Sequence, residues 1–127
     1  MAGSDGKRDH ALLAPSFGQP GPPFLPTPGQ IYWLRSLLYS STDRAGARPA
    51  VVLDVPNRAS ARIRIVTRTH QSAPGIRHPA DPSLSLNSDG VFSVLTSVER
   101  SMWRPENVKL CGLLDEEIFK AVQERFD

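Results

Sequence analysis

The chain has 127 residues, of which 39% are hydrophobic and 22% charged, and its formal net charge is +2. This length and composition are typical of a single globular domain. No apolar run approaches the roughly 18 residues of a membrane span, and the N-terminus lacks an apolar stretch with a small-residue cleavage site, so we expect a cytoplasmic protein without a secretory signal. The single cysteine, Cys111, excludes a disulfide framework within the chain and a zinc site built on paired cysteines.

Prolines gather at the N-terminal end, where half of the 12 precede Gln30. Proline fixes its own backbone angle and lacks an amide donor, so residues 1–29 are predicted to form an extended, partly polyproline-like arm rather than a helix or an inner strand. A proline-rich ligand for a small recognition domain is the alternative interpretation. Apolar side chains would let parts of the arm dock on a surface: Leu12, Leu13, Phe17, Phe24 and Leu25. The folded domain is predicted to span residues 30–127.

Three strands are predicted in the first half of this domain. Residues 30–35 are rich in aromatic and branched side chains, and a loop follows over residues 40–46. Residues 50–55 form a compact apolar run, typical of a strand buried on both faces, and Pro49 stands just before it, where a missing amide does least harm. In residues 62–66 arginine and isoleucine alternate, which predicts a strand with one wet and one buried face.

The second half is predicted to hold a long connection followed by two strands. Residues 72–90 contain three prolines and two glycines and are predicted to be irregular, with a short strand at residues 84–86. Residues 91–103 are predicted to form a long, bent strand, with a helix as the alternative, and residues 108–110 a last short strand.

A single amphipathic helix is predicted at the C-terminal end. Asp115 is placed to cap it, and the two acidic residues that follow suit the positive end of a helix dipole. Ile118, Val122 and Phe126 recur at helical spacing. Short strands with one terminal helix predict a mainly β fold, a small β-barrel or curled sheet with the helix packed on it.

The near-neutral net charge hides a segregation along the chain. Ten basic and five acidic residues lie between Arg44 and Lys109, a net charge of +5, and nine of the ten are arginines. From Asp115 onward, five acidic and two basic residues give −3. The strand region is therefore a candidate anion-binding surface, since the planar guanidinium suits phosphate. Exposed arginines on strands are also ordinary surface residues, and this interpretation stays open.

Common catalytic and cofactor motifs do not occur in the sequence. There is no glycine-rich phosphate loop with a lysine and no GxSxG elbow. His10, His70 and His78 are too few and too unpatterned to predict a metal site, so we expect neither a metal nor a cofactor. Cys111 lies at the last predicted strand, which favours a core thiol over a nucleophile.

One local arrangement points to chemistry on a phosphodiester. Arg48 directly precedes Pro49, which holds its backbone extended at the start of a buried strand, and the loop before it contains Asp43 and Arg44. The next strand runs into Thr69, and adjacent strands would bring Arg48 and Thr69 to the same rim. An arginine and a hydroxyl that converge there would bind a phosphodiester and stabilise the charge of its transition state. The alternative is a surface arginine and a strand-end threonine.

At these residues the sequence resembles the MazF/PemK family of toxins from bacterial toxin–antitoxin systems. The matching pieces are residues 29–33 (GQIYW) as a first strand and residues 45–53 (AGARPAVVL) as a signature. Thr69 falls where the family has a threonine after its third strand. Residues 90–104 and the terminal helix over 113–126 fit in order and spacing, so the resemblance covers most of the chain. The GxRPAVVL piece is its most specific part.

The resemblance implies an SH3-like small β-barrel of the plasmid-maintenance-toxin type, usually a homodimer. The implied activity is that of an mRNA interferase, a metal-independent endoribonuclease toxin that cleaves single-stranded RNA. In this reaction the 2′-hydroxyl attacks the adjacent phosphate and leaves a cyclic phosphate and a free 5′-hydroxyl. The resemblance also implies inhibition by a cognate antitoxin, whose acidic, partly disordered tail would cover the basic rim.

The resemblance assigns roles to individual residues. Arg48 would neutralise the pentavalent phosphate, and Thr69 would position it. Arginine is a poor base, since its pKa exceeds about 12, so the proton needs another acceptor. Asp43 stands where the family often has an acid. His70 is an additional candidate that rests on the chemistry of histidine and not on the resemblance, provided that the strand has ended before it. The predicted RNA contacts are Arg44, Thr67, Arg68 and His70.

Two features depart from the family pattern. Thr67 and Arg68 replace the usual proline and apolar residue before the threonine, and the proline-rich arm is an addition. Two other functions therefore stay open. One is a non-catalytic nucleic-acid-binding or protein-binding module on the same barrel, which the first departure favours. The other is a gyrase-poisoning toxin, an activity of a related barrel that depends on residues of the C-terminal helix.

Overall fold

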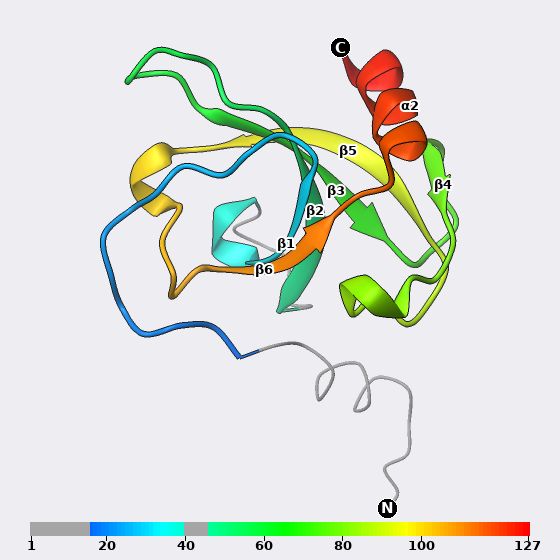
Figure 1. Cartoon of the computed structure of the whole chain (residues 1–127), viewed down its shortest axis with the longest axis horizontal. Helices are drawn as coiled ribbons and strands as arrows, with labels where there is room; N and C mark the ends of the chain where they lie inside the picture. The colour runs from blue at the N-terminus through cyan, green and yellow to red at the C-terminus, as the bar shows by residue number, and fades with distance from the viewer. Residues whose placement is uncertain (1–15, 40–45) are drawn as a thin grey trace, which may run out of the picture.

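Six antiparallel strands form one sheet in the computed structural model of the chain, which describes residues 16–39 and 46–127 (Figure 1). Across the sheet the order is β4-β5-β3-β2-β1-β6, so β4 and β6 form its edges. The strands are β1 (Gln30–Arg35), β2 (Ala47–Asp54), β3 (Ile63–Thr69), β4 (Ile76–His78), β5 (Gly90–Val98) and β6 (Val108–Leu113). The helical elements are the short 3-10 helices η1 (Ser36–Leu38), η2 (Pro82–Leu84) and η3 (Arg100–Met102) and the α-helix α2 (Glu116–Phe126).

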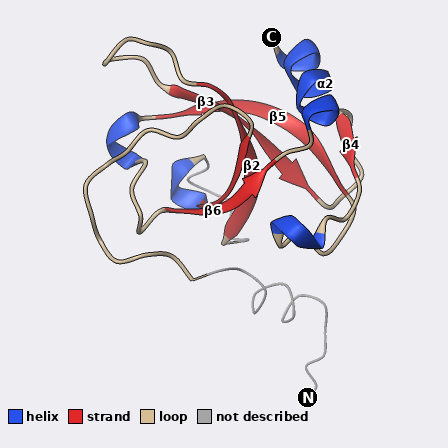
Figure 2. Ribbon diagram, in the orientation of Figure 1, coloured by secondary structure: helices blue, strands red, loops and turns tan. Residues whose placement is uncertain are grey.

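The predicted fold class, mainly β with a C-terminal helix, is confirmed. The strands curve around a common interior, and α2 lies beside β4 (Figure 2). Among the described strands no pairing joins β4 to β6, so the sheet is curled but not closed.

The sheet buries side chains on both faces. Along β1, Ile31 and Trp33 belong to one core cluster and Tyr32 and Leu34 to another, and all four are at most 4% exposed. We call the first face the helix face, because Val122 of α2 is buried in the same cluster. The cluster on the other side, which we call the opposite face, consists of Tyr32, Leu34, Leu38, Ala50, Val52, Ile63, Ile65, Val98, Trp103 and Val108.

Strand β1 has its predicted bounds, whereas β2 begins three residues earlier than predicted. Pro49 therefore lies inside β2, opposite Trp33 of β1. Pairing of β2 with β3 starts only at Ala50, so this ladder does not require an amide at the proline. As a result Arg48 is a strand residue and its backbone is held by β1.

Strands β3 and β5 differ from the prediction at their ends. β3 starts at Ile63. One of its faces was predicted to be exposed to solvent, and this is wrong beyond Ile65. Val66 and Arg68 on that face are buried, because other parts of the chain cover the helix face. β5 is a strand and not a helix, but it ends at Val98, since η3 redirects the chain. β6 runs three residues further than predicted.

The connection between β3 and β5 contains a strand that the sequence did not indicate. β4 pairs with β5 at the sheet edge over three residues, too few to produce a readable alternation. The short strand predicted around Leu84 is wrong. Leu84 ends η2, and Leu86 forms an isolated bridge with Asp81, although both leucines are buried.

The C-terminal helix is confirmed together with its cap. The carboxylate of Asp115 accepts hydrogen bonds from the amides of Glu117 at 3.1 Å and Ile118 at 3.3 Å. Val122 is buried, and Ile118 and Phe126 are half-buried against the helix-face cluster. The predicted stripe is thus the face by which α2 packs on the sheet.

Residues 16–29 of the proline-rich arm form neither helix nor strand and run beside the segment between η3 and β6 (Figure 1). The amide of Gly18 donates to the carbonyl of Pro105 at 2.9 Å, and the amide of Phe24 donates to that of Trp103 at 3.0 Å. This part of the arm is therefore held against the domain by backbone hydrogen bonds.

Two of the predicted docking residues of the arm have contacts in the structure. Phe17 packs against the helix-face cluster, and the ring of Phe24 lies 6.4 Å from that of Tyr32. Leu12 and Leu13 lie outside the described residues. The boundary at residue 30 marks where regular structure begins, and the contacts of the arm extend N-terminal of it.

Candidate functional site

Arg48 and Thr69 come from the adjacent strands β2 and β3. The antiparallel register begins with the pair Ala50 and Thr67, and Arg48 and Thr69 each stand two residues beyond that pair on their own strand. Because side chains alternate along a strand, both point to the same side of the sheet as Ala50, which is the opposite face. Arg48 and Thr69 thus share a face of adjacent strands, and their convergence at one rim stays a prediction.

The two residues keep access to solvent while their neighbour does not. Arg48 and Thr69 are half-buried, whereas Thr67 is only 7% exposed. The hydroxyl of Thr67 donates to the carbonyl of Val94 at 3.5 Å. Thr67, a predicted RNA contact, is thus engaged with β5 and offers little surface to a ligand.

A β-bulge adjoins this rim. β5 pairs Val94 with Thr67 but Phe92 with Arg68, so Ser93 is an extra residue in β5. A bulge redirects the side chains beside it and is common next to functional sites. Here it turns Phe92 into the helix-face cluster and leaves Val94 on the face of Arg48.

Tyr39, which follows η1, is a residue of this site that sequence reasoning missed. The guanidinium carbon of Arg48 lies 6.0 Å from the centroid of its ring, at the limit of a cation–π contact. The Tyr39 hydroxyl donates to the carbonyl of Gly46 at 3.5 Å. An aromatic ring nine positions before an arginine carries no local signal, so only the folded chain brings the pair together.

His70 satisfies the condition under which it was considered for proton transfer. β3 ends at Thr69, so His70 lies beyond the strand, and it is exposed. The hydroxyl oxygen of Thr69 accepts a hydrogen bond from the amide of Gln71 at 3.2 Å, which orients it in the turn. Alternation along the strand therefore does not force His70 away from Thr69.

The loop before β2 holds two predicted site residues. Asp43, the predicted acid, and Arg44, a predicted RNA contact, lie outside the described residues. The described chain resumes at Gly46, whose φ of +89° is in the left-handed region that favours glycine.

Arg68, predicted to contact RNA, is instead a buried residue of the helix face. It is 3% exposed, and its Nε donates to Nδ1 of His78 at 2.9 Å. Its Nη2 donates to the carbonyls of His78 at 3.0 Å and Ser88 at 2.7 Å. A Cβ at Gly90 would lie 2.5 Å from the guanidinium carbon, so the glycine provides the space that Arg68 occupies. The prediction was wrong because His78, Ser88 and Gly90 enclose the guanidinium on the helix face.

His78 couples this buried cluster to pH. Burial lowers the pKa of His78 below its ordinary value of 6.5, and the positive Arg68 lowers it further, against Asp81 and Asp115, which raise it. The imidazole is 2% exposed and stacks on Phe92 with ring centroids 5.3 Å apart. The folded chain therefore favours neutral imidazole, whose Nδ1 accepts from Arg68.

The free energy of unfolding is expected to fall as pH drops below 6.5 in the wild type. In that range the unfolded chain binds a proton at His78 that the folded chain resists, so stability is greatest above the ordinary pKa. Urea unfolding at pH 8, 7, 6 and 5 measures the effect, with His78→Gln as the matched control. The expectation is contradicted if the wild type and His78→Gln show the same slope with pH.

Cys111 is expected to react slowly with thiol reagents in the folded protein. Burial raises its pKa to about 11, and its Sγ donates to the carbonyl of Lys109 at 3.8 Å. Labelling at pH 8 should therefore be on the order of 10²-fold slower than in urea, where the thiol titrates near its ordinary value. Equal rates in both conditions would show a reactive thiol instead of a core one.

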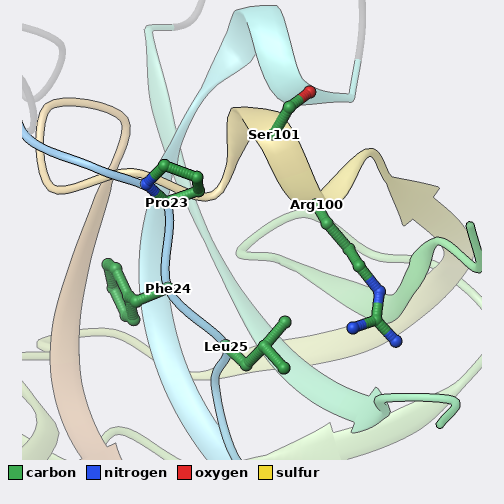
Figure 3. Close-up of a pocket in the computed structure, with 5 residues that line it drawn as sticks. All are labelled: Pro23, Phe24, Leu25, Arg100 and Ser101. Carbon is green, nitrogen blue, oxygen red and sulfur yellow. The ribbon is translucent and has the colours of Figure 1, made fainter. Parts of the chain in front are cut away.

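Two open hollows in the described surface lie away from Arg48. One, of about 220 Å³, is lined by Pro23, Phe24, Leu25, Arg100 and Ser101 (Figure 3). The guanidinium of Arg100 donates to the carbonyls of Ala61 and Pro56. What this hollow offers a ligand is therefore mainly apolar contact. The other, of about 500 Å³, contains Arg62 and Arg64, but these pair with Glu99 and Asp54. In both hollows the arginine side chains are bound by carbonyl or carboxylate oxygens of the protein itself.

Within residues 16–39 and 46–127, no three His, Cys, Asp or Glu side chains gather where they could hold a metal ion. No helix in the same residues has the length and apolar character needed to cross a bilayer. The sequence matches no protein-family model, and no curated protein is significantly similar to it. Function is therefore inferred from the residues of the chain and from the geometry around Arg48.

Proposed function

We propose that this protein is a metal-independent endoribonuclease toxin of the MazF/PemK type, which cleaves single-stranded RNA. The observation that carries the proposal is the pairing of Ala50 with Thr67, because Arg48 and Thr69, each two residues beyond that pair, are half-buried on the same face of adjacent strands. The resemblance of residues 45–53 to the family signature supports it, since Arg48 stands within that signature.

Arg48 supplies the charge that the reaction needs. Its guanidinium presents N–H donors in a planar fork that matches two phosphate oxygens. As the phosphorus becomes five-coordinate, negative charge grows on those oxygens, and a donor already held by a strand stabilises it without reorganisation. The hydroxyl of Thr69 is a further hydrogen-bond donor to the same group.

The nucleophile belongs to the RNA. The 2′-oxygen forms a bond to phosphorus while the bond from phosphorus to the 5′-oxygen breaks, which leaves a 2′,3′-cyclic phosphate and a 5′-hydroxyl. The 2′-proton passes to a base, and the leaving 5′-oxygen gains a proton. Asp43 and His70 are the two candidates for the base, and imidazole also suits the return of a proton near neutral pH.

The rest of the proposal concerns the fold type and partners. We assign the curled six-stranded sheet with its C-terminal helix to the SH3-like barrels of plasmid-maintenance toxins. The partners are single-stranded RNA, a cognate antitoxin with an acidic segment and a second copy of the chain. Its place of action is the cytoplasm, where messenger RNA is found. The segregation of charge, +5 over residues 44–109, supports a polyanionic ligand and an acidic inhibitor.

The test is incubation of the purified protein with a labelled single-stranded RNA in excess chelator. We expect cleavage that leaves 2′,3′-cyclic phosphate and 5′-hydroxyl ends, and no cleavage of the same strand with a 2′-deoxy sugar at the cut position. Salt-dependent binding with intact RNA would favour the binding module. Products with 5′-phosphate ends would contradict attack by the 2′-hydroxyl.

A further inference from the structure

Two non-polar side chains are candidates to contact bases near Arg48. One is the ring of Tyr39, which follows η1 and whose centroid lies 6.0 Å from the guanidinium carbon. The other, beyond β3, is Val94 of β5, whose exposed fraction of 54% is high for a branched apolar residue in a strand. Aromatic and apolar side chains of this kind contact the flat faces of unstacked nucleobases.

Val94 shares the face of the proposed phosphate site. It lies directly opposite Thr67, so its side chain points to the same side of the sheet as Arg48 and Thr69. Further along β5 on this face, Val98 is 1% exposed and belongs to the core. On this face Thr96 separates the two valines, and Val94, in the middle of β5, is the exposed one.

The spacing suits a strand of RNA that crosses the sheet. β3 lies between β2 and β5, and neighbouring strands are about 4.8 Å apart, so Val94 is roughly 10 Å from the backbone of β2. The guanidinium of Arg48 lies near the ring of Tyr39, so a nucleotide whose phosphate is held there would have a base within reach of Tyr39. A strand of RNA that continued from there across β3 would reach Val94.

We propose that Tyr39 and Val94 form two base-binding positions, one on each side of the phosphate held by Arg48. Tyr39 stacks on one base, and Val94 supports the face of the other. This inference rests on the proposed function, because it takes single-stranded RNA as the ligand. RNA is the occupant that the charge favours, since a polyanion complements the +5 of residues 44–109.

The first experiment measures binding of a short 2′-O-methyl RNA by fluorescence anisotropy. This RNA lacks the attacking hydroxyl and stays intact. Val94→Ser and Tyr39→Leu are each expected to raise Kd about 5- to 50-fold, whereas Tyr39→Phe keeps the ring and changes it about 2-fold or less. Leu95→Ser is the matched control, because Leu95 is 39% exposed but points to the helix face. Thermal unfolding checks that each variant is folded.

The second experiment removes a base instead of a side chain. Oligonucleotides with one abasic position on either side of the central phosphate are compared on the wild type and the two variants. Val94→Ser should lose its sensitivity to one abasic position and Tyr39→Leu to the other. The proposal is overturned if neither variant loses sensitivity, if both lose it at the same position, or if Leu95→Ser weakens binding as much as Val94→Ser.

These outcomes are separate from those that test the nuclease. Suppose that the wild type leaves unmodified RNA intact, but that each of the two variants loses its sensitivity to a different abasic position. The nuclease proposal then fails and the base-binding positions stand. If RNA is cut and kcat/KM of Val94→Ser and Tyr39→Leu equals that of the wild type, the base-binding positions fail and the nuclease stands.

Discussion

Replacement of Arg48 by alanine is expected to lower the rate of RNA cleavage by about 10²- to 10³-fold, which is the usual effect of removing one preorganised donor to a transition-state charge. Arg48 is paired with Leu34 of β1, so its backbone stays in place when the side chain is removed. The loss should therefore fall on kcat, with a smaller change in the thermal midpoint. Single-turnover rates at saturating protein, read together with thermal unfolding, measure both quantities.

Two variants separate the role of Arg48 from general electrostatics. Arg62→Ala removes the same charge from a side chain that is 49% exposed and paired with Glu99, and it should change the rate about 2-fold or less. Arg48→Lys keeps the charge but not the planar fork, so most of the loss should remain. Equal losses in Arg48→Ala and Arg62→Ala would contradict a specific role for Arg48.

Replacement of Arg68 by alanine is expected to lower the free energy of unfolding by about 2 to 4 kcal/mol. The substitution leaves the carbonyls of His78 and Ser88 without their donors and opens space against Gly90. Burial lowers the pKa of Arg68, while the negative charges of Asp89 and Asp81 raise it. Urea unfolding at pH 7.5 measures the loss.

Arg64→Ala is the control for Arg68 on the same strand and the same face. Arg64 pairs with Asp54 at 3.8 Å with its side chain 34% exposed, so its removal should cost about 1 kcal/mol or less. If Arg68→Ala instead leaves stability unchanged and weakens RNA binding, the assignment of Arg68 to the buried cluster is wrong and the original prediction of an RNA contact returns.

Elements stabilised by contacts close in sequence were predictable. The cap of α2 is formed by Asp115 and the two amides that follow it, and its apolar stripe repeats within one short helix. The bounds of β1 and the buried centre of β2 were likewise readable, because strands covered on both faces leave continuous apolar runs. In each case the pattern and the cause lie within about a dozen residues.

Elements that depend on distant partners were not predictable in detail. β4 is three residues long and exists by pairing with β5. The docked course of residues 16–29 depends on carbonyls of Trp103 and Pro105, more than 70 residues away. No local pattern records such contacts.

Arg48 and Arg68 show most directly which properties follow from the sequence and which depend on the tertiary structure. By itself the sequence determined the mainly β class, the capped C-terminal helix, the segregation of charge and the candidate pair Arg48 and Thr69. Only the tertiary structure decided which strand arginine is accessible, since Arg48 points to the rim of the opposite face and Arg68 into the helix face beneath His78 and Gly90. The physical reason is that burial of a strand side chain depends on what packs over its face, and those residues come from other parts of the chain.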